Sequence, residues 1–281
     1  MNEKETDRVE PERGDSHLQE SRDAMVEALH QLNLIRLPSS SRSSPQVVDV
    51  VKTVLEHLPV DVSAKDVTDA SRLFALGRTV WSDTLLQQPA DLLYREDRKL
   101  YQQYPKTGYE IVTKLPGLGG VAELVLHHQE RWNGSGFPNR VKGEEIPVGA
   151  RIIKLSVDFI EYQRGMILKR QVGRQDVFKL INKFSGRFYD PGLVGPFIDI
   201  CKEYSPDLGI ADKDVQVLDT KRVEPGMKLA RDLFSSSGIL LLNEGKVFDR
   251  GLIEKLKRFE SMEPDPYTLL VRPASEESDE A

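Results

Sequence analysis

Two adjacent histidines, His127 and His128, are the residues whose type and spacing most directly suggest metal chemistry. They open the segment HHQERWNGSGFP (127–138), in which Gln129, Glu130 and a Gly-rich turn follow. Imidazole and carboxylate groups are common ligands of transition metals. Consecutive helical residues point about 100° apart, so both histidines cannot face one pocket squarely. Two interpretations stay open: a residual metal site, or one satisfied core histidine beside one surface histidine.

The turn that follows has a structural interpretation and a binding one. Gly134 and Gly136 are expected to supply the positive-φ positions of a tight turn, with Phe137 and Pro138 packing behind them. Arg131 and Trp132 could stack on a guanine base, although a tryptophan here is also typical of a core position. Several cations lie near this segment, as a solvated face or as contacts to an anion. The candidate phosphate contacts are Arg140, Lys142 and Arg151 near this segment, and Arg78 about 50 residues upstream of it.

The segment HHQERWNGSGFPNRVKGEEIPVGARI (127–152) resembles the signature of the HD-GYP family, in which an HHE run precedes a Gly-x-Gly-Tyr-Pro turn. Flanking segments agree: FALGRTVWSDTLL, YQQYPKTGYEIVTKLPGL, GRFYDPGLVGPF and PGMKLARDLFSSSGILLLNEG. The resemblance covers about residues 50–272. It implies a helical phosphodiesterase domain that uses two or three iron or manganese ions to hydrolyse the bacterial second messenger cyclic di-GMP, with the turn as an interaction surface.

Matched position by position, the family's metal ligands are largely absent here. The lost ligand positions are Phe74, Ala75, Tyr104 and Gln129, and Arg78 replaces a lysine. The residual metal-site candidates are His128, Asp158, Glu130 and His127. A downstream aspartate is matched by Asp158, with Val157 as an equal alternative in register, and His57 is a candidate upstream ligand that has no certain alignment.

A bridged metal pair needs more ligands than these, and the bridging carboxylate is lost. We therefore interpret the chain as a catalytically degenerate HD-GYP protein, a bacterial signalling pseudoenzyme. No catalytic residues and no cofactor are expected, and any metal would be iron or manganese at a partial site. The alternatives are an active cyclic di-GMP phosphodiesterase with a reduced metal site, and a purely structural adaptor.

The expected partners are signalling proteins, either diguanylate cyclase-type domains or a response regulator, with cyclic di-GMP as a candidate ligand. A formal charge of −6 argues against DNA. Cys201 is the only cysteine, so an intramolecular disulfide is excluded. No apolar run approaches the ~20 residues of a membrane helix. We expect a soluble cytoplasmic protein.

These residues must be positioned by a mainly α fold: an HD-GYP-like helical bundle with a small C-terminal α+β domain. Residues 1–45 are predicted to be a charged segment, partly disordered, that holds a short helix (22–37) and a Ser/Pro linker (38–45). Residues 46–210 form the degenerate HD-GYP-like domain, with a helix capped by Ser63. Alternating apolar residues predict strands and one helix in the α+β domain at 215–273. Residues 274–281 are predicted to be a disordered acidic tail.

Overall fold

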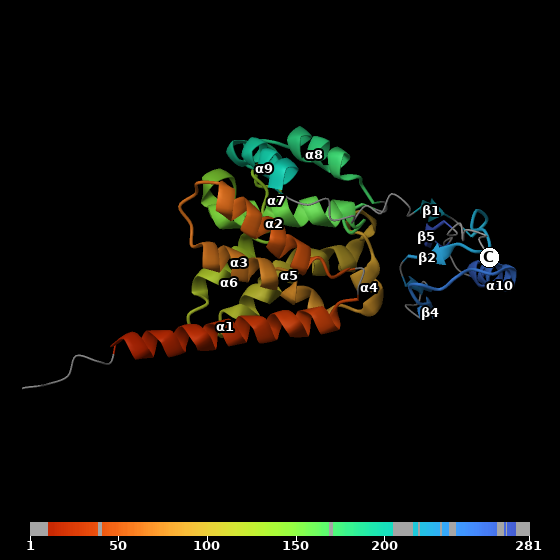
Figure 1. Cartoon of the computed structure of the whole chain (residues 1–281), viewed down its shortest axis with the longest axis horizontal. Coiled ribbons are helices and arrows are strands. Elements are labelled where there is room, and N and C mark those ends of the chain that lie inside the picture. The colour runs from red at the N-terminus through yellow and green to blue at the C-terminus, as the bar shows by residue number, and fades with distance from the viewer. Residues whose placement is uncertain are drawn as a thin grey trace, which may run out of the picture.

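The computed structural model describes residues 11–38, 41–168, 171–204, 216–218, 220–230, 232–235, 240–262, 267 and 269–273. It is mainly helical, which confirms the predicted fold class. Figure 1 shows α1 along one side of a helical bundle and α8 and α9 on the opposite side, with α2, α3, α5, α6 and α7 between them. The helices are α1 (Pro11–Arg36), α2 (Ser44–His57), α3 (Ala64–Leu73), α4 (Asp83–Gln87), α5 (Arg95–Val112), α6 (Gly119–His127), α7 (Val148–Gln163), α8 (Arg174–Lys183) and α9 (Pro191–Tyr204). Short 3-10 turns are η2 (Leu76–Val80), η3 (Ala90–Leu92) and η4 (Gly143–Glu145).

Helix α7 runs through the centre of the bundle. Apart from Arg151, every residue of α7 from Gly149 to Gln163 is buried, including the polar Lys154, Asp158 and Glu161. Burying a charged side chain is costly unless it is paired and hydrogen-bonded. The polar groups of α7 must therefore find partners inside the bundle, and this requirement shapes the candidate site.

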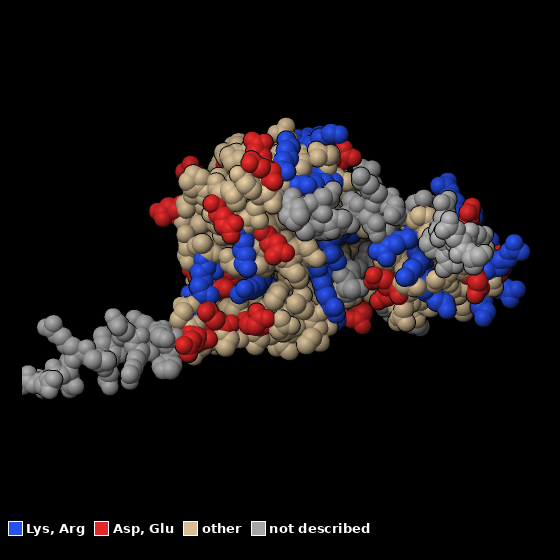
Figure 2. Space-filling model, viewed as in Figure 1, with Lys and Arg blue, Asp and Glu red and all other residues tan. Residues whose placement is uncertain are grey.

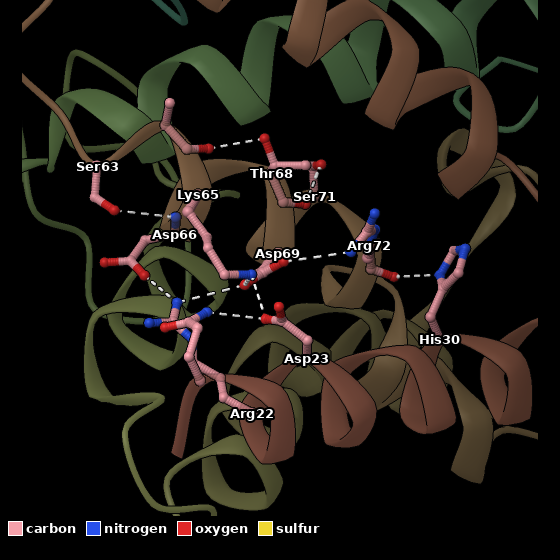
Figure 3. Close-up of polar contacts among 12 residues, drawn as sticks. Arg22, Asp23, His30, Ser63, Lys65, Asp66, Thr68, Asp69, Ser71 and Arg72 are labelled. Atoms are coloured by element: carbon pink, nitrogen blue, oxygen red, sulfur yellow. Dashed lines mark hydrogen bonds and ion pairs between the residues drawn. The ribbon is translucent and has the colours of Figure 1, made fainter. Parts of the chain in front are cut away.

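The N-terminal helix is longer than the sequence predicted. It begins at Pro11 rather than at residue 22, and proline is favoured in the first turn of a helix, where its missing N–H costs nothing. Figure 3 shows how charged contacts dock α1 on α3: Arg22 contacts Asp66 and Asp69, and Lys65 bridges Asp23 at 2.6 Å and Asp69 at 3.0 Å. Ser63 caps α3 as predicted, because its hydroxyl accepts the N–H of Asp66 at 3.2 Å.

The predicted Ser/Pro linker is packed against the bundle in its described residues 41–45. Ser41, Ser43 and Ser44 are each only 1% exposed. The hydroxyl of Ser41 donates to the carbonyl of Leu86, and that of Ser43 donates to Glu161 Oε1 at 3.1 Å. Serine composition suggested solvent exposure, but the hydroxyls are satisfied by tertiary hydrogen bonds.

The C-terminal lobe has its own apolar core and lies beside the helical bundle in Figure 1. Strands β1 (Gln216–Leu218) and β2 (Lys228–Leu229) both pair antiparallel with β5 (Leu269–Arg272), β3 (Leu233–Phe234) pairs with β4 (Leu240–Leu242), and α10 spans Arg250–Glu260. The buried core consists of Val223, Leu229, Leu233, Phe248, Ile253, Leu256, Tyr267, Leu269 and Val271. The predicted strands and helix are therefore present, whereas residues 1–10, the junction at 205–215 and the tail at 274–281 lie outside the described residues.

Candidate functional site

His128, the histidine that matches a family ligand, is fully buried and both its ring nitrogens are already used. It lies at the C-terminal end of α6 with an exposed fraction of 0%. Nδ1 is 2.6 Å from the carbonyl oxygen of Val125, and Nε2 is 2.7 Å from the hydroxyl of Tyr104. A carbonyl oxygen only accepts, so the proton is assigned to Nδ1, and Nε2 accepts from Tyr104. Burial lowers the pKa of His128 to about 3, which keeps the ring neutral.

Tyr104 connects His128 to a buried ion pair. The Tyr104 oxygen accepts a hydrogen bond from Arg78 Nη2 at 3.0 Å. Arg78 also donates to Glu161 Oε1 at 2.6 Å and to Oε2 at 3.2 Å, in a bidentate pair. Burial alone would lower the pKa of Arg78, but the Glu161 carboxylate raises it, so the guanidinium remains charged.

Two of the positions predicted to have lost a ligand, Phe74 and Ala75, lie on the other side of the centre and are apolar. Phe74 packs its ring edge-on against His128, with 5.6 Å between ring centroids, and Ala75 is buried. Their placement depends on Gly77, because a Cβ there would lie 1.9 Å from the carbonyl oxygen of Tyr104. This close approach packs η2 against α5. It places Phe74 beside His128 and Arg78 beside Tyr104.

A second polar cluster surrounds Gln129, the other lost position next to His128. Lys154 Nζ donates to Gln129 Oε1 at 2.9 Å and to Asp158 Oδ1 at 2.8 Å. The hydroxyl of Tyr189 donates to Asp158 Oδ2 at 2.8 Å. Burial lowers the pKa of Lys154, while the Asp158 carboxylate opposes that shift. Of the two candidate registers, the structure brings Asp158 into this cluster, whereas Val157 lies in the apolar core.

Glu130 holds the glycine-rich turn rather than facing His128. Its Oε1 accepts the N–H groups of Asn139 at 2.6 Å and of Arg140 at 3.0 Å. Burial raises the pKa of Glu130, although these two N–H groups counteract the shift. Gly134 has a φ of +77°, as predicted for a tight turn. The predicted positive φ at Gly136 is wrong. Glycine is needed there because a Cβ would lie 2.3 Å from the nitrogen of Arg131.

The turn packs onto α5 through one aromatic residue. Phe137 contacts Tyr101 and Tyr104, with ring centroids 5.4 Å and 6.4 Å apart. Pro138 follows it, joined to Phe137 by a cis peptide bond. The turn therefore packs, through Phe137, against the tyrosine that hydrogen-bonds His128.

Other predicted residues are not brought into this centre. His127 turns toward Glu123, 3.6 Å away, at the surface of α6. His57 is exposed and stacks on Tyr204 with 3.7 Å between ring centroids, so the structure gives no support for it as an upstream ligand. His128 is therefore a core residue, whereas His127 is partly buried, with 13% of its side chain exposed.

Core packing and base stacking were both open for Trp132, and the structure places the ring between these two situations. Trp132 is half-buried, with the guanidinium of Arg151 lying 5.5 Å from its ring centre. Arg151 itself is paired with Asp190 at 2.8 Å, and Arg78 is committed to Glu161. Of the candidate phosphate contacts, only Arg140 and Lys142 are exposed.

The side chains of the centre do not fit a binuclear iron or manganese site. Within the described ranges, no group of three or more His, Cys, Asp or Glu side chains is placed to hold a metal ion. The lone pair of His128 Nε2 is taken by Tyr104, and two cationic groups, Arg78 and Lys154, occupy the centre beside the remaining carboxylates. A divalent cation would be repelled by both charges. Sequence reasoning missed the roles of Ser43 and Glu161 and the burial of Lys154, for which periodicity carries no signal.

Comparison with known proteins agrees with the motif. The HD domain family model matches residues 20–193. The chain therefore belongs to the HD domain family. It is 27% identical over 193 residues to a cyclic di-GMP phosphodiesterase of Thermotoga maritima, covering 68% of this chain and 52% of that protein. It is 25% identical over 218 residues to a probable cyclic di-GMP phosphodiesterase of Vibrio cholerae, covering 69% and 49%.

The chain thus spans about half the length of these curated relatives, 52% and 49%. Its homology is to HD-GYP cyclic di-GMP phosphodiesterases, which supports the predicted family. Among solved structures, the Bd1817 HDG"Y"P protein of Bdellovibrio bacteriovorus matches with a TM-score of 0.48 and 18% identity, over 58% of this chain and 53% of that one. Among the residues that the structure describes, no helix is both long and apolar enough to cross a membrane.

Proposed function

We propose that this chain is a catalytically degenerate HD-GYP signalling protein that binds partners, with cyclic di-GMP as a candidate ligand, and does not hydrolyse the nucleotide. The observation that supports the proposal most directly is the hydrogen-bonded series Arg78–Tyr104–His128. It uses the lone pair that a metal would need and introduces a permanent positive charge next to it. Lys154 places a second basic group beside Gln129 and Asp158 and donates a hydrogen bond to each.

Loss of the metals removes the means of making a nucleophile at neutral pH. Metal coordination lowers the pKa of bound water to about 7. A lone general base contributes only about 10²–10⁴-fold, whereas enzymes accelerate the slowest phosphoryl reactions by more than about 10¹⁷-fold. His128 is also a poor base in this setting, because burial lowers its pKa to about 3. We expect no measurable turnover of cyclic di-GMP.

The proposed partners are signalling proteins, either diguanylate cyclase-type domains or a response regulator, in the cytoplasm. The glycine-rich turn at 134–138 is the proposed contact for such a partner. Glu130 Oε1 stabilises this turn by accepting the backbone N–H groups of Asn139 and Arg140, so the turn needs no bound metal to keep its conformation.

The test is metal analysis of the purified full-length chain together with chromatography of cyclic di-GMP incubated with added Mn²⁺ or Fe²⁺. We expect well under one equivalent of iron, manganese or zinc per chain, and no hydrolysis products, with an active HD-GYP phosphodiesterase as positive control. Two tightly held metals per chain, with cleavage abolished by His128→Ala, would contradict the proposal.

A repair experiment sharpens this test. Restoring four ligands together, through Phe74→His, Ala75→Asp, Tyr104→His and Gln129→His, should raise metal occupancy before activity, because residues around the ligands have also changed. Adding Lys154→Ala, which removes the competing ammonium, should raise occupancy further. If Lys154→Ala lowers occupancy in the repaired chain, the charge argument is wrong.

One observation favours the alternative, an active phosphodiesterase with a reduced metal site. Glu130 Oε2 is buried and forms no hydrogen bond with the described residues, so it is a donor atom that remains available. Metal content distinguishes the two candidates: in the alternative, Glu130→Gln should lower it, whereas in the degenerate protein there is no bound metal to lose.

A further inference from the structure

Three backbone segments lie side by side on the surface next to the degenerate centre. The N–H groups of Trp132 and Asn133 donate to the carbonyls of Phe188 at 3.1 Å and Arg187 at 3.0 Å. On the other side, the N–H of Gly143 donates to the carbonyl of Trp132 at 2.8 Å. Segment 131–134 is therefore held between 187–188 and 140–143, so side chains distant in sequence share one face.

This face carries five cations, which we call the cationic face: Arg131, Arg140, Lys142, Lys183 and Arg187. Within the described part of the chain, none of these five side chains forms an ion pair, so their charges are not neutralised by a neighbouring carboxylate. In Figure 2, Lys and Arg side chains gather over α8, the helix that ends at Lys183. A positive region on a chain of net charge −6 concentrates anions locally.

Aromatic rings hold several of these cations in place without neutralising them. The Arg131 guanidinium lies 4.0 Å from the centre of the Phe188 ring, and that of Arg187 lies 5.3 Å from the same ring. Lys183 Nζ lies 5.9 Å from the centre of the Phe184 ring, which stacks on Phe188 at 4.5 Å. A ring attracts a cation through its face and accepts none of the N–H bonds that a carboxylate would take. The donors of these groups therefore remain free for an oxyanion.

The face is close to the polar centre. Arg131 follows Glu130 directly, and its charge contributes to lowering the pKa of Lys154 and opposes the burial that raises the pKa of Tyr162. A ligand bound on this face would therefore lie beside the former metal centre and outside it. Planar guanidinium groups match the oxygens of a phosphate better than an ammonium does.

We propose that the cationic face binds the phosphate group of a nucleotide, with Arg131 and Arg187 as the principal contacts and Lys183 as a third. This inference deepens the proposed function, on which it rests, by locating ligand binding on the protein surface away from the metal-ligand positions. It requires no metal and no chemical step. Phosphate diesters and monoesters share the required chemistry, and the experiment separates them.

The experiment measures binding of cyclic di-GMP, GMP and inorganic phosphate to the full-length chain by isothermal titration calorimetry. Lys183→Gln with Arg187→Gln should weaken binding about tenfold or more, since each charge-assisted contact is a large fraction of the affinity. The matched control, Lys179→Gln with Lys202→Gln, removes the same charge from lysines paired with Asp176 and Asp199. It should leave Kd within about twofold, because exposed pairs contribute little.

Additional measurements keep the result interpretable. Melting temperatures should be equal for both double variants, since all four side chains are exposed. Arg187→Lys should retain part of the affinity that Arg187→Gln loses, and Kd should rise with NaCl concentration. Tight binding of cyclic di-GMP but not GMP identifies a diester ligand, whereas the reverse identifies a monoester.

Three outcomes would overturn the inference: no binding of any probe to the wild type, an unchanged Kd in the Lys183/Arg187 variant, or equal weakening in the control. Failure of the proposed function is recognised separately. Chromatography of the same samples would then reveal metal-dependent cleavage, whichever residues bind the phosphate.

Discussion

Removing the hydroxyl of Tyr104 tests whether the polar network holds together the buried centre around His128. Tyr104→Phe keeps the ring, which packs against Trp81 and Phe137. It removes the one group that donates to His128 Nε2 and accepts from Arg78. Arg78 retains its two bonds to Glu161, but His128 Nε2 is left buried with no donor.

The magnitude follows from what is lost. A hydrogen bond involving a charged group contributes about 1.5–3 kcal/mol, and a buried acceptor left without a partner costs about 1–3 kcal/mol. Part of the first contribution is retained, because Arg78 stays paired. We therefore expect the free energy of unfolding to fall by about 2–4 kcal/mol. For a chain of this size, about 2–4 °C per kcal/mol gives a melting temperature lower by about 5–15 °C.

The matched control is Tyr101→Phe. Tyr101 lies on the same helix and packs against Tyr104 and Phe137, and no hydrogen bond of its hydroxyl is formed with the described residues. The same atom is removed, so a change below about 0.5 kcal/mol is expected. Urea unfolding followed by tryptophan fluorescence measures both variants. If Tyr104→Phe is as stable as Tyr101→Phe, the hydroxyl does not hold the centre and the reasoning fails.

Three further outcomes are expected. In urea unfolding, Gly77→Ala should destabilise the chain by about 1–3 kcal/mol or more, because the new Cβ would lie 1.9 Å from a carbonyl oxygen. Gly119→Ala is the control, because no atom lies within 4 Å of a Cβ there, and it should not destabilise the chain. Equal effects of the two substitutions would contradict the packing argument. The pKa of His128 is about 3 in the folded chain and about 6.5 in the unfolded chain, so the unfolded chain binds more protons below pH 6.5. The free energy of unfolding should therefore fall from pH 7 to pH 5, by up to about 1.4 kcal/mol per pH unit. In urea titrations, His128→Gln should flatten that slope, whereas His57→Gln should not. Asp69→Ala should cost about 1.5–3 kcal/mol, because it removes the charge-assisted contacts of Asp69 with Arg22, Lys65 and Arg72, which stay partly solvated. Protection of α1 amides from hydrogen exchange should fall, and unchanged protection would show that α1 docks by other contacts.

The sequence by itself determined the helices, the family and which residue types stand at the family's expected ligand positions. Apolar spacing identified the helices because one face of each must be buried. The HHQERWNGSGFP motif carried the family assignment because backbone turns need particular residues at particular positions. Ser63 was predictable as a cap for the same local reason. All of these signals act over a few neighbouring residues.

Only the tertiary structure decided what replaces the missing ligands. Arg78 and Tyr104 are 26 residues apart in sequence, and Ser43 and Glu161 are 118 apart, so their pairing depends on where the helices cross. Lys154 is buried although lysine is usually exposed, and Trp132 is only half-buried although tryptophan is usually highly buried. Residue type sets the cost of burying a group, whereas the partner that offsets this cost is supplied by the packing of distant segments.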